Sequence, residues 1–112
     1  MIDLDIKFPP NIKKRQITNA EIGDIIELYG ESLKELYNFE DATIKVWVFQ
    51  KPNPVITSNY TKDGLHLIIG LHMLHSHQMM LRDIVITEES NREIFSTMGC
   101  NNSLEDIFDL SI

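Results

Sequence analysis

Residues 61–70 of this chain are Thr61-Lys62-Asp63-Gly64-Leu65-His66-Leu67-Ile68-Ile69-Gly70. The dipeptide Asp63-Gly64 predicts a turn, because glycine adopts a positive φ without steric cost. The apolar run that follows predicts a strand from Leu65 to Ile69. Side chains alternate across a strand, so we expect His66 on the face opposite Leu65, whose own face is typical of a core.

Two side chains of this stretch are candidate ligand contacts. Lys62 lies just before the predicted turn, within reach of the face that carries His66. An ammonium group and an imidazole beside a glycine turn suit an anionic ligand such as a phosphate. The alternative interpretation is an edge strand that carries an incidental histidine.

Length and composition set the broad class. A chain of 112 residues with 43% hydrophobic residues predicts one globular domain with a modest core. It contains no apolar run near the ~20 residues that a membrane helix needs. The single cysteine, Cys100, excludes an internal disulfide and is typical of a reducing compartment. The net charge of -7 argues against non-specific binding of nucleic acid by this segment alone.

The N-terminal segment alternates between aliphatic and charged residues over positions 2–7, which predicts a strand that ends before Pro9-Pro10. Asp3 and Asp5 are two positions apart and therefore point to one face, roughly 7 Å from each other along the strand. Two carboxylates at this spacing can hold one or two divalent cations, as in phosphoryl-transfer enzymes. The alternative is a solvated polar face.

The remaining pattern predicts helices and one further strand. Thr18 and Glu21 form a capping box before a helix that spans residues 20–38, and a second helical period begins near Leu74. That period either continues to residue 98 or gives way to a third helix, with Gly99 as its stop. Ser103 opens another short helical turn. The predicted fold class is α/β (α+β): a small mixed or antiparallel sheet, helices on one face, and Asp3, Asp5 and His66 on the other.

Three other groups of residues each have two alternative interpretations. The basic loop 11–16 either solubilises the chain or contacts phosphate. On the strand predicted for residues 44–50, Trp47 is either a core or covering residue or a stacking platform for a base. The histidines suggest zinc, but only one thiol is present and their spacing is irregular, which favours a polar helix entrance instead. These histidines are His66, His72, His75 and His77.

Three segments together resemble the archaeo-eukaryotic primase superfamily. They are Asp3-Leu4-Asp5, the stretch from Lys62 to His66, and Ile107-Phe108-Asp109. In that superfamily a strand carries two aspartates, a second strand carries a histidine, and a third segment carries another aspartate. The chain is most similar to the primase part of the primase–helicases of nucleocytoplasmic large DNA viruses. Similarity also covers residues 21–37, 48–52 and 61–82.

The resemblance implies a role for each matched residue. Asp3, Asp5 and Asp109 would hold catalytic Mg²⁺ or Mn²⁺, His66 would contact the phosphates of the incoming nucleotide, and Lys62 would assist it. The implied reaction is two-metal nucleotidyl transfer from nucleoside triphosphates on a single-stranded DNA template. The implied partner is a helicase domain in the same or another chain, with no membrane, at a viral replication site in the host-cell cytoplasm. Carboxylates at the metal site also account for part of the negative charge.

The chain departs from the family pattern at both ends. It begins at the strand with the two aspartates and ends just after Asp109, where the family continues into a basic segment. We therefore expect residues 1–112 to be one partial primase catalytic domain, whose activity in isolation is an open question. The alternatives are a catalytically incompetent metal- or nucleotide-binding module, a metal-binding interaction domain built on the histidines, and an interaction domain that needs no metal.

Overall fold

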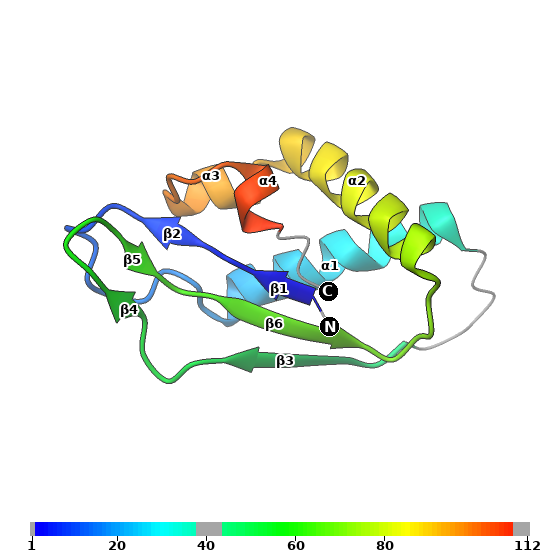
Figure 1. The fold of residues 1–112 in the computed structure, drawn as a ribbon, viewed down its shortest axis with the longest axis horizontal. Coiled ribbons are helices and arrows are strands. Elements are labelled where there is room, and N and C mark those ends of the chain that lie inside the picture. The colour runs from blue at the N-terminus through cyan, green and yellow to red at the C-terminus, as the bar shows by residue number, and fades with distance from the viewer. Residues whose placement is uncertain (1, 38–43, 109–112) are drawn as a thin grey trace.

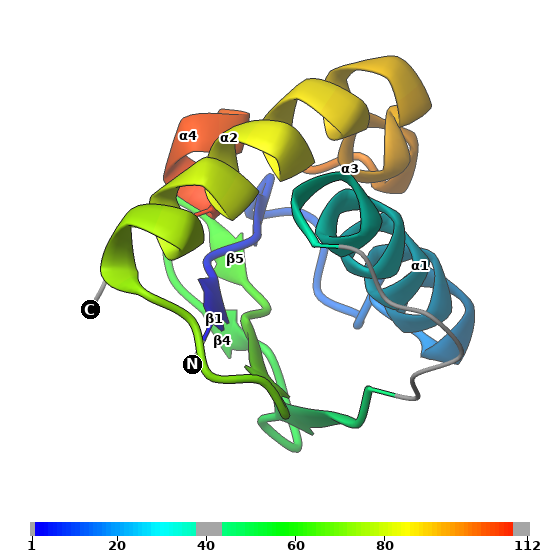
Figure 2. The same ribbon diagram turned by 90° about the vertical axis from the view of Figure 1, so that its right-hand side faces the viewer.

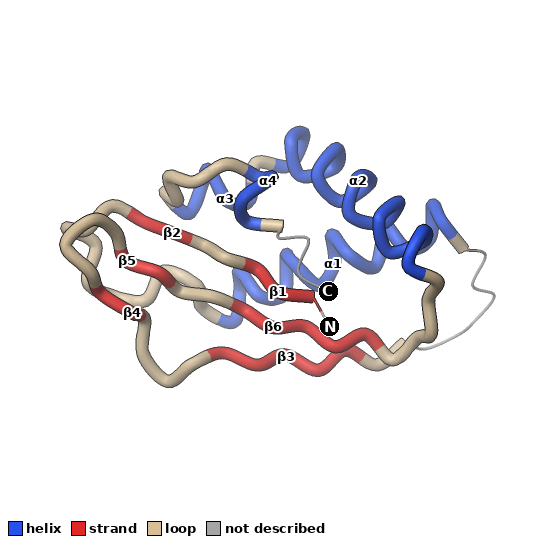
Figure 3. Tube along the Cα trace, viewed as in Figure 1, coloured by secondary structure: helices blue, strands red, loops and turns tan. Residues whose placement is uncertain are grey.

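The computed structural model describes residues 2–37 and 44–108 and contains strands and helices in an α/β arrangement (Figures 1 and 3). In chain order the elements are β1 (Ile2–Leu4), β2 (Lys7–Phe8), α1 (Asn19–Leu36), β3 (Val46–Gln50), β4 (Val55–Ile56), β5 (Thr61–Lys62), β6 (Leu65–Ile69), α2 (His75–Arg92), α3 (Ile94–Met98) and α4 (Leu104–Ile107).

The strands of the described residues form two small antiparallel sheets, with the orders β1-β6-β3 and β2-β5-β4. The two sheets are linked because β1 leads into β2 and β5 leads into β6 along the same antiparallel ribbon. The predicted strand of residues 2–7 is therefore interrupted at Asp5. There the amide of Asp5 donates to Ile107 O (2.9 Å), while Ile6 O accepts from the amide of Asp63 (2.9 Å).

The helices cover one side of the strands, as Figure 2 shows. On each strand, the apolar side chains of one face pack against the apolar faces of α1 and α2 in a common core. Burial of each aliphatic side chain of this size stabilises the fold by roughly 1.5–3 kcal/mol. The fully or nearly fully buried residues at this contact are Leu4, Leu65, Leu67, Ile25, Leu28, Leu81 and Val85.

The helix signals of the sequence are confirmed. Both halves of the capping box between Thr18 and Glu21 are present at the start of α1. Gly99 ends α3 with a φ of 87°, and the hydroxyl of Ser103 accepts from the amide of Asp106 (3.2 Å) at the start of α4. α1 ends at Leu36, two residues before the predicted end at position 38, which lies outside the described residues.

The prediction that Gly64 adopts a positive φ in a turn is wrong. Among the described glycines only Gly99 has a positive φ, so Asp63-Gly64 is not a left-handed turn but an extended link between β5 and β6. Gly64 is instead suited to a close backbone approach. A Cβ at this position would lie 3.2 Å from Leu4 O, a contact that requires the neighbouring strand to shift.

Glu89 is a buried carboxylate at the junction of α2 and α3. Its side chain is 1% exposed, and Oε1 accepts from the amide of Phe95 (3.0 Å). Within the described residues Oε2 has no hydrogen-bond partner. Burial raises the pKa of Glu89 above the ordinary range of a glutamate.

We expect Glu89→Gln to remove a pH dependence of folding stability. A group whose pKa is raised in the folded state contributes its full stabilisation of the fold at pH values below its unfolded-state pKa. This stabilisation is lost as the pH rises through the folded-state pKa. The free energy of unfolding of the wild type should therefore fall relative to that of Glu89→Gln as the pH rises above the ordinary pKa of a glutamate. Urea denaturation measures this difference, with Glu27→Gln on the exposed face of α1 as the control. A difference that does not change with pH would contradict the prediction.

No described helix is long and apolar enough to cross a membrane.

Candidate functional site

Asp3 and His66 lie opposite each other on neighbouring strands. β1 pairs with β6 in the register Asp3↔His66, and β3 pairs with β6 in the register Phe49↔His66. Residues directly opposite in an antiparallel pair point to the same face. Asp3 Oδ1 lies 3.6 Å from His66 Nε2, so the two form an ion pair when the imidazole is protonated. The prediction that the two share the sheet face away from the core is confirmed.

Asp5 and Lys62 form the second contact of the site. Lys62 Nζ lies 3.0 Å from Asp5 Oδ1, at the point where the β1–β2 segment runs beside the β5–β6 segment. The hydrogen bond to Asp5 raises the pKa of Lys62, and the negative charges of Asp5 and Asp3 act in the same direction. Lys62 therefore stays protonated at neutral pH and offers a fixed positive charge beside the two carboxylates.

The C-terminal segment approaches the same strand. Phe108 forms an antiparallel bridge with Leu4, the residue between the two aspartates. Arg82 of α2 holds this segment: its Nε donates to Phe108 O (2.6 Å), and its Nη2 donates to Glu105 O (3.1 Å). The third predicted carboxylate, Asp109, lies outside the described residues. Phe108, the last described residue, thus lies beside β1 and directly precedes Asp109 in the sequence.

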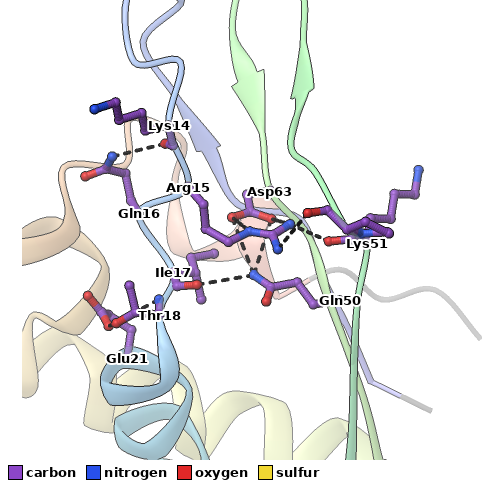
Figure 4. A network of polar contacts seen from close by, with 10 residues as sticks. Lys14, Arg15, Gln16, Ile17, Thr18, Glu21, Gln50, Lys51 and Asp63 are labelled. Carbon is purple, nitrogen blue, oxygen red and sulfur yellow. Dashed lines mark hydrogen bonds and ion pairs between the residues drawn. The ribbon is translucent and has the colours of Figure 1, made fainter.

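Arg15 and the buried Asp63 form an ion pair next to Lys62 in the chain. Arg15 Nε and Nη2 each lie 3.1 Å from an Asp63 carboxylate oxygen, and the Asp63 side chain is only 2% exposed. Figure 4 shows the guanidinium between Asp63 and the backbone of Lys51, whose carbonyl also accepts from Arg15. Gln50 Nε2 adds longer contacts to Asp63 (3.4 and 3.5 Å) and to Ile17 O (3.4 Å).

The network positions the site because Asp63 immediately follows Lys62 and is three residues before His66. Sequence reasoning missed it. The sequence places Arg15 in a basic loop that either solubilises the chain or contacts phosphate, whereas in the structure its guanidinium donates to Asp63 and to two backbone carbonyls. The available signal was an aspartate beside an apolar strand, which is unfavourable unless it is paired.

The other three histidines do not form a metal-binding cluster with His66. His77 Nδ1 lies 2.7 Å from the hydroxyl of Tyr37, which ties the start of α2 to the end of α1. Within residues 2–37 and 44–108, no group of three or more histidine, cysteine, aspartate or glutamate side chains is arranged to hold a metal ion. The described part of the chain therefore offers no zinc site built on these histidines.

The donors at Asp3 and Asp5 fit a hard divalent cation. Both side chains are about one-quarter exposed and supply carboxylate oxygens, which Mg²⁺ and Mn²⁺ prefer. Asp5 is at present neutralised by Lys62, so a cation would share or replace that ammonium group. When bound, such an ion would neutralise developing charge on a phosphate and orient it.

Comparison with known proteins identifies the family. The family described as "C962R protein N-terminal AEP domain" matches residues 1–112. A protein of Acanthamoeba polyphaga mimivirus named "Putative helicase L207/L206" is 30% identical over 110 residues, which cover 97% of this chain and 12% of that protein. The chain thus spans about one-eighth of the length of this relative. No solved structure matches it. With Asp3 opposite the strand-borne His66, the chain belongs to the archaeo-eukaryotic primase (AEP) domains of the C962R N-terminal family.

Proposed function

We propose that this chain is the catalytic palm of a primase, which transfers nucleotidyl groups from nucleoside triphosphates to a growing primer. The observation that carries the proposal is the pairing of two carboxylates with an ammonium group and an imidazole across neighbouring strands. His66 faces Asp3 and Lys62 faces Asp5. A site for a metal-bound triphosphate needs these two kinds of group side by side.

Each residue has a distinct task in this proposal. Asp3 and Asp5, joined by Asp109, hold Mg²⁺ or Mn²⁺. Lys62 and His66 bind the triphosphate, the lysine as a point charge and the histidine as a donor on a rigid strand. The oxygen of a primer 3′-hydroxyl attacks the α-phosphorus and gives up its proton to solvent. The bond between the α-phosphorus and the bridging oxygen breaks, and pyrophosphate leaves. Arg82 is a positioning residue, because it holds the segment that leads to Asp109.

The name of the mimivirus relative and the viral family extend the proposal to partners. We infer that the domain works beside a helicase segment on single-stranded DNA, at a viral replication site in the host-cell cytoplasm. The Lys62–Asp5 ion pair favours one second candidate, a nucleotide-binding module in which the ammonium group takes the place of a metal ion.

Lys62→Met should change metal and nucleotide binding in opposite directions. Without the ammonium group Asp5 is free, so Mn²⁺ should bind up to about fivefold tighter, the worth of a partly exposed ion pair. Loss of a charged donor should weaken triphosphate binding roughly tenfold. Calorimetry with Mn²⁺ alone, and then with a nucleoside triphosphate and Mn²⁺, measures both effects.

Lys7→Met is the matched control, because Lys7 is opposite Lys62 in the β2–β5 pair but contacts Asp106 instead of Asp5. It should leave both affinities unchanged. His66→Ala should weaken triphosphate binding and retain Mn²⁺. If neither the wild type nor Lys62→Met binds Mn²⁺ while the triphosphate binds both, the metal-dependent primase fails and the second candidate holds. Equal triphosphate binding by all variants would reject both.

A further inference from the structure

The open face of the β1-β6-β3 sheet continues beyond Asp3 and His66 onto β3, which is an edge strand of that sheet. Phe49 is paired with His66 on this face, and Trp47 is paired with Ile68 in the next row. Phe49 is 52% exposed and Trp47 is 48% exposed. Large aromatic side chains usually bury their area in the core. Two of them on the solvent face of one strand therefore need a reason.

Two lysines flank the aromatic pair along the same edge. Lys45 and Lys51 are exposed and keep the two-residue period of Trp47 and Phe49. Within the described residues neither ammonium group has an ion-pair partner. The edge therefore presents a row of cation, ring, ring and cation. We call residues Lys45, Trp47, Phe49 and Lys51 the aromatic edge.

We propose that the aromatic edge binds an unpaired nucleic-acid strand, with one base stacked on Phe49, one on Trp47, and the two lysines on the flanking phosphates. Sequence-tolerant binding of single strands combines aromatic stacking with cations along the backbone. Successive rings on one strand face are about 7 Å apart, so each has room for its own base. The proposal deepens the proposed function, since the bound strand would be the template beside His66.

Charge favours this occupant over a second copy of the chain. The chain has a net charge of -7, yet the aromatic edge carries only positive groups, which complement phosphates. In an antiparallel pairing of two β3 edges, Lys45 of one copy would approach Lys51 of the other. Lysines on an edge strand are a common means of preventing such pairing.

The orientation of Trp47 depends on Gly70. A Cβ at Gly70 would lie 3.2 Å from the Trp47 ring and 3.2 Å from Lys45 O. The glycine thus leaves space for the indole to lie against the end of β6. Trp47 is also the single tryptophan of the chain, so its fluorescence reports on this surface alone.

The test is binding of a fluorescein-labelled twelve-nucleotide oligothymidylate, followed by anisotropy and by Trp47 quenching. We expect quenching in the wild type and an affinity loss of about tenfold in Phe49→Ala and in Trp47→Ala. Met80→Ala, which removes an exposed apolar side chain from α2, should bind as the wild type does. Circular dichroism checks that each variant is folded. The matching oligouridylate distinguishes a DNA strand from an RNA strand.

Two further experiments distinguish the contribution of base stacking to binding from the contribution of charge. An abasic oligonucleotide of the same length should bind weakly and leave Trp47 unquenched, because it has phosphates and no bases. Lys45→Gln with Lys51→Gln should make the negative slope of log affinity against log salt shallower by about 1.4. Lys13→Gln with Lys34→Gln, also exposed, is the matched charge control.

Asp3→Asn with Asp5→Asn should keep oligothymidylate binding, so failure of the metal site and failure of the aromatic edge are distinguishable. Equal binding of the abasic strand, unchanged affinity in Phe49→Ala, or concentration-dependent dimerisation that buries Trp47 without any oligonucleotide would overturn the proposal.

Discussion

Replacing Asp3 and Asp5 together by asparagine is expected to abolish Mn²⁺ binding and nucleotidyl transfer while the fold persists. Both carboxylates lie on the partly exposed face and contact Lys62 and His66 instead of core residues. Loss of such exposed pairs costs at most about 1 kcal/mol of folding stability each. Loss of the metal removes several kcal/mol of transition-state stabilisation, and about 4 kcal/mol corresponds to a 10³-fold slower reaction.

Paramagnetic broadening by Mn²⁺ and calorimetry measure the site directly, and primer extension measures the reaction. The matched control is Asp24→Asn with Glu27→Gln, which removes the same two charges from the exposed face of α1. The control should broaden as the wild type does. Equal broadening in the Asp3 and Asp5 variant would place the metal elsewhere and reject the roles proposed for both aspartates.

Replacing Arg15 by methionine should destabilise the domain by about 3 kcal/mol, the usual cost of leaving a buried charge without its partner. Asp63 is almost fully buried, and Arg15 supplies its two shortest side-chain contacts. Arg15→Lys should restore only part of the stability, since an ammonium group cannot reproduce the two-point contact or reach both backbone carbonyls. Urea denaturation of the three proteins measures these differences.

The neighbouring Lys14 provides the control, because Lys14→Met changes an exposed side chain and should shift stability by no more than about 0.5 kcal/mol. A double-mutant cycle of Arg15→Met and Asp63→Asn should show coupling, since the two side chains touch. Arg15→Lys should also weaken triphosphate binding, because Asp63 anchors the link between Lys62 and His66. If Arg15→Met is as stable as the wild type, the network does not support this link.

Local pattern was enough to predict which residues share a face. Alternation along a strand and the helical period are properties of the backbone within a few residues. They placed Leu65 in the core and Asp3 and His66 on the opposite face, as the structure has them. The capping signals at Thr18 and Ser103 are equally local and are confirmed. Family resemblance added the expected chemistry, and the family itself is confirmed.

Contacts between distant segments were decided by the tertiary structure. The sequence does not state the register Asp3↔His66, because a shift by one residue would turn every side chain of β1 to the other face. Arg15 and Asp63 are 48 positions apart, and neither local period nor composition pairs them. The close approach of Gly64 to Leu4 O likewise exists only once two strands are aligned.

The chain by itself therefore determined the faces of its elements and the residue types available for phosphate and metal chemistry. The tertiary structure decided which of these residues meet. It brought Lys62 to Asp5, paired Arg15 with the buried Asp63, and left Trp47 and Phe49 exposed beside His66. The physical reason is that hydrogen-bond register and burial depend on partners far along the chain, whereas side-chain periodicity depends on immediate neighbours alone.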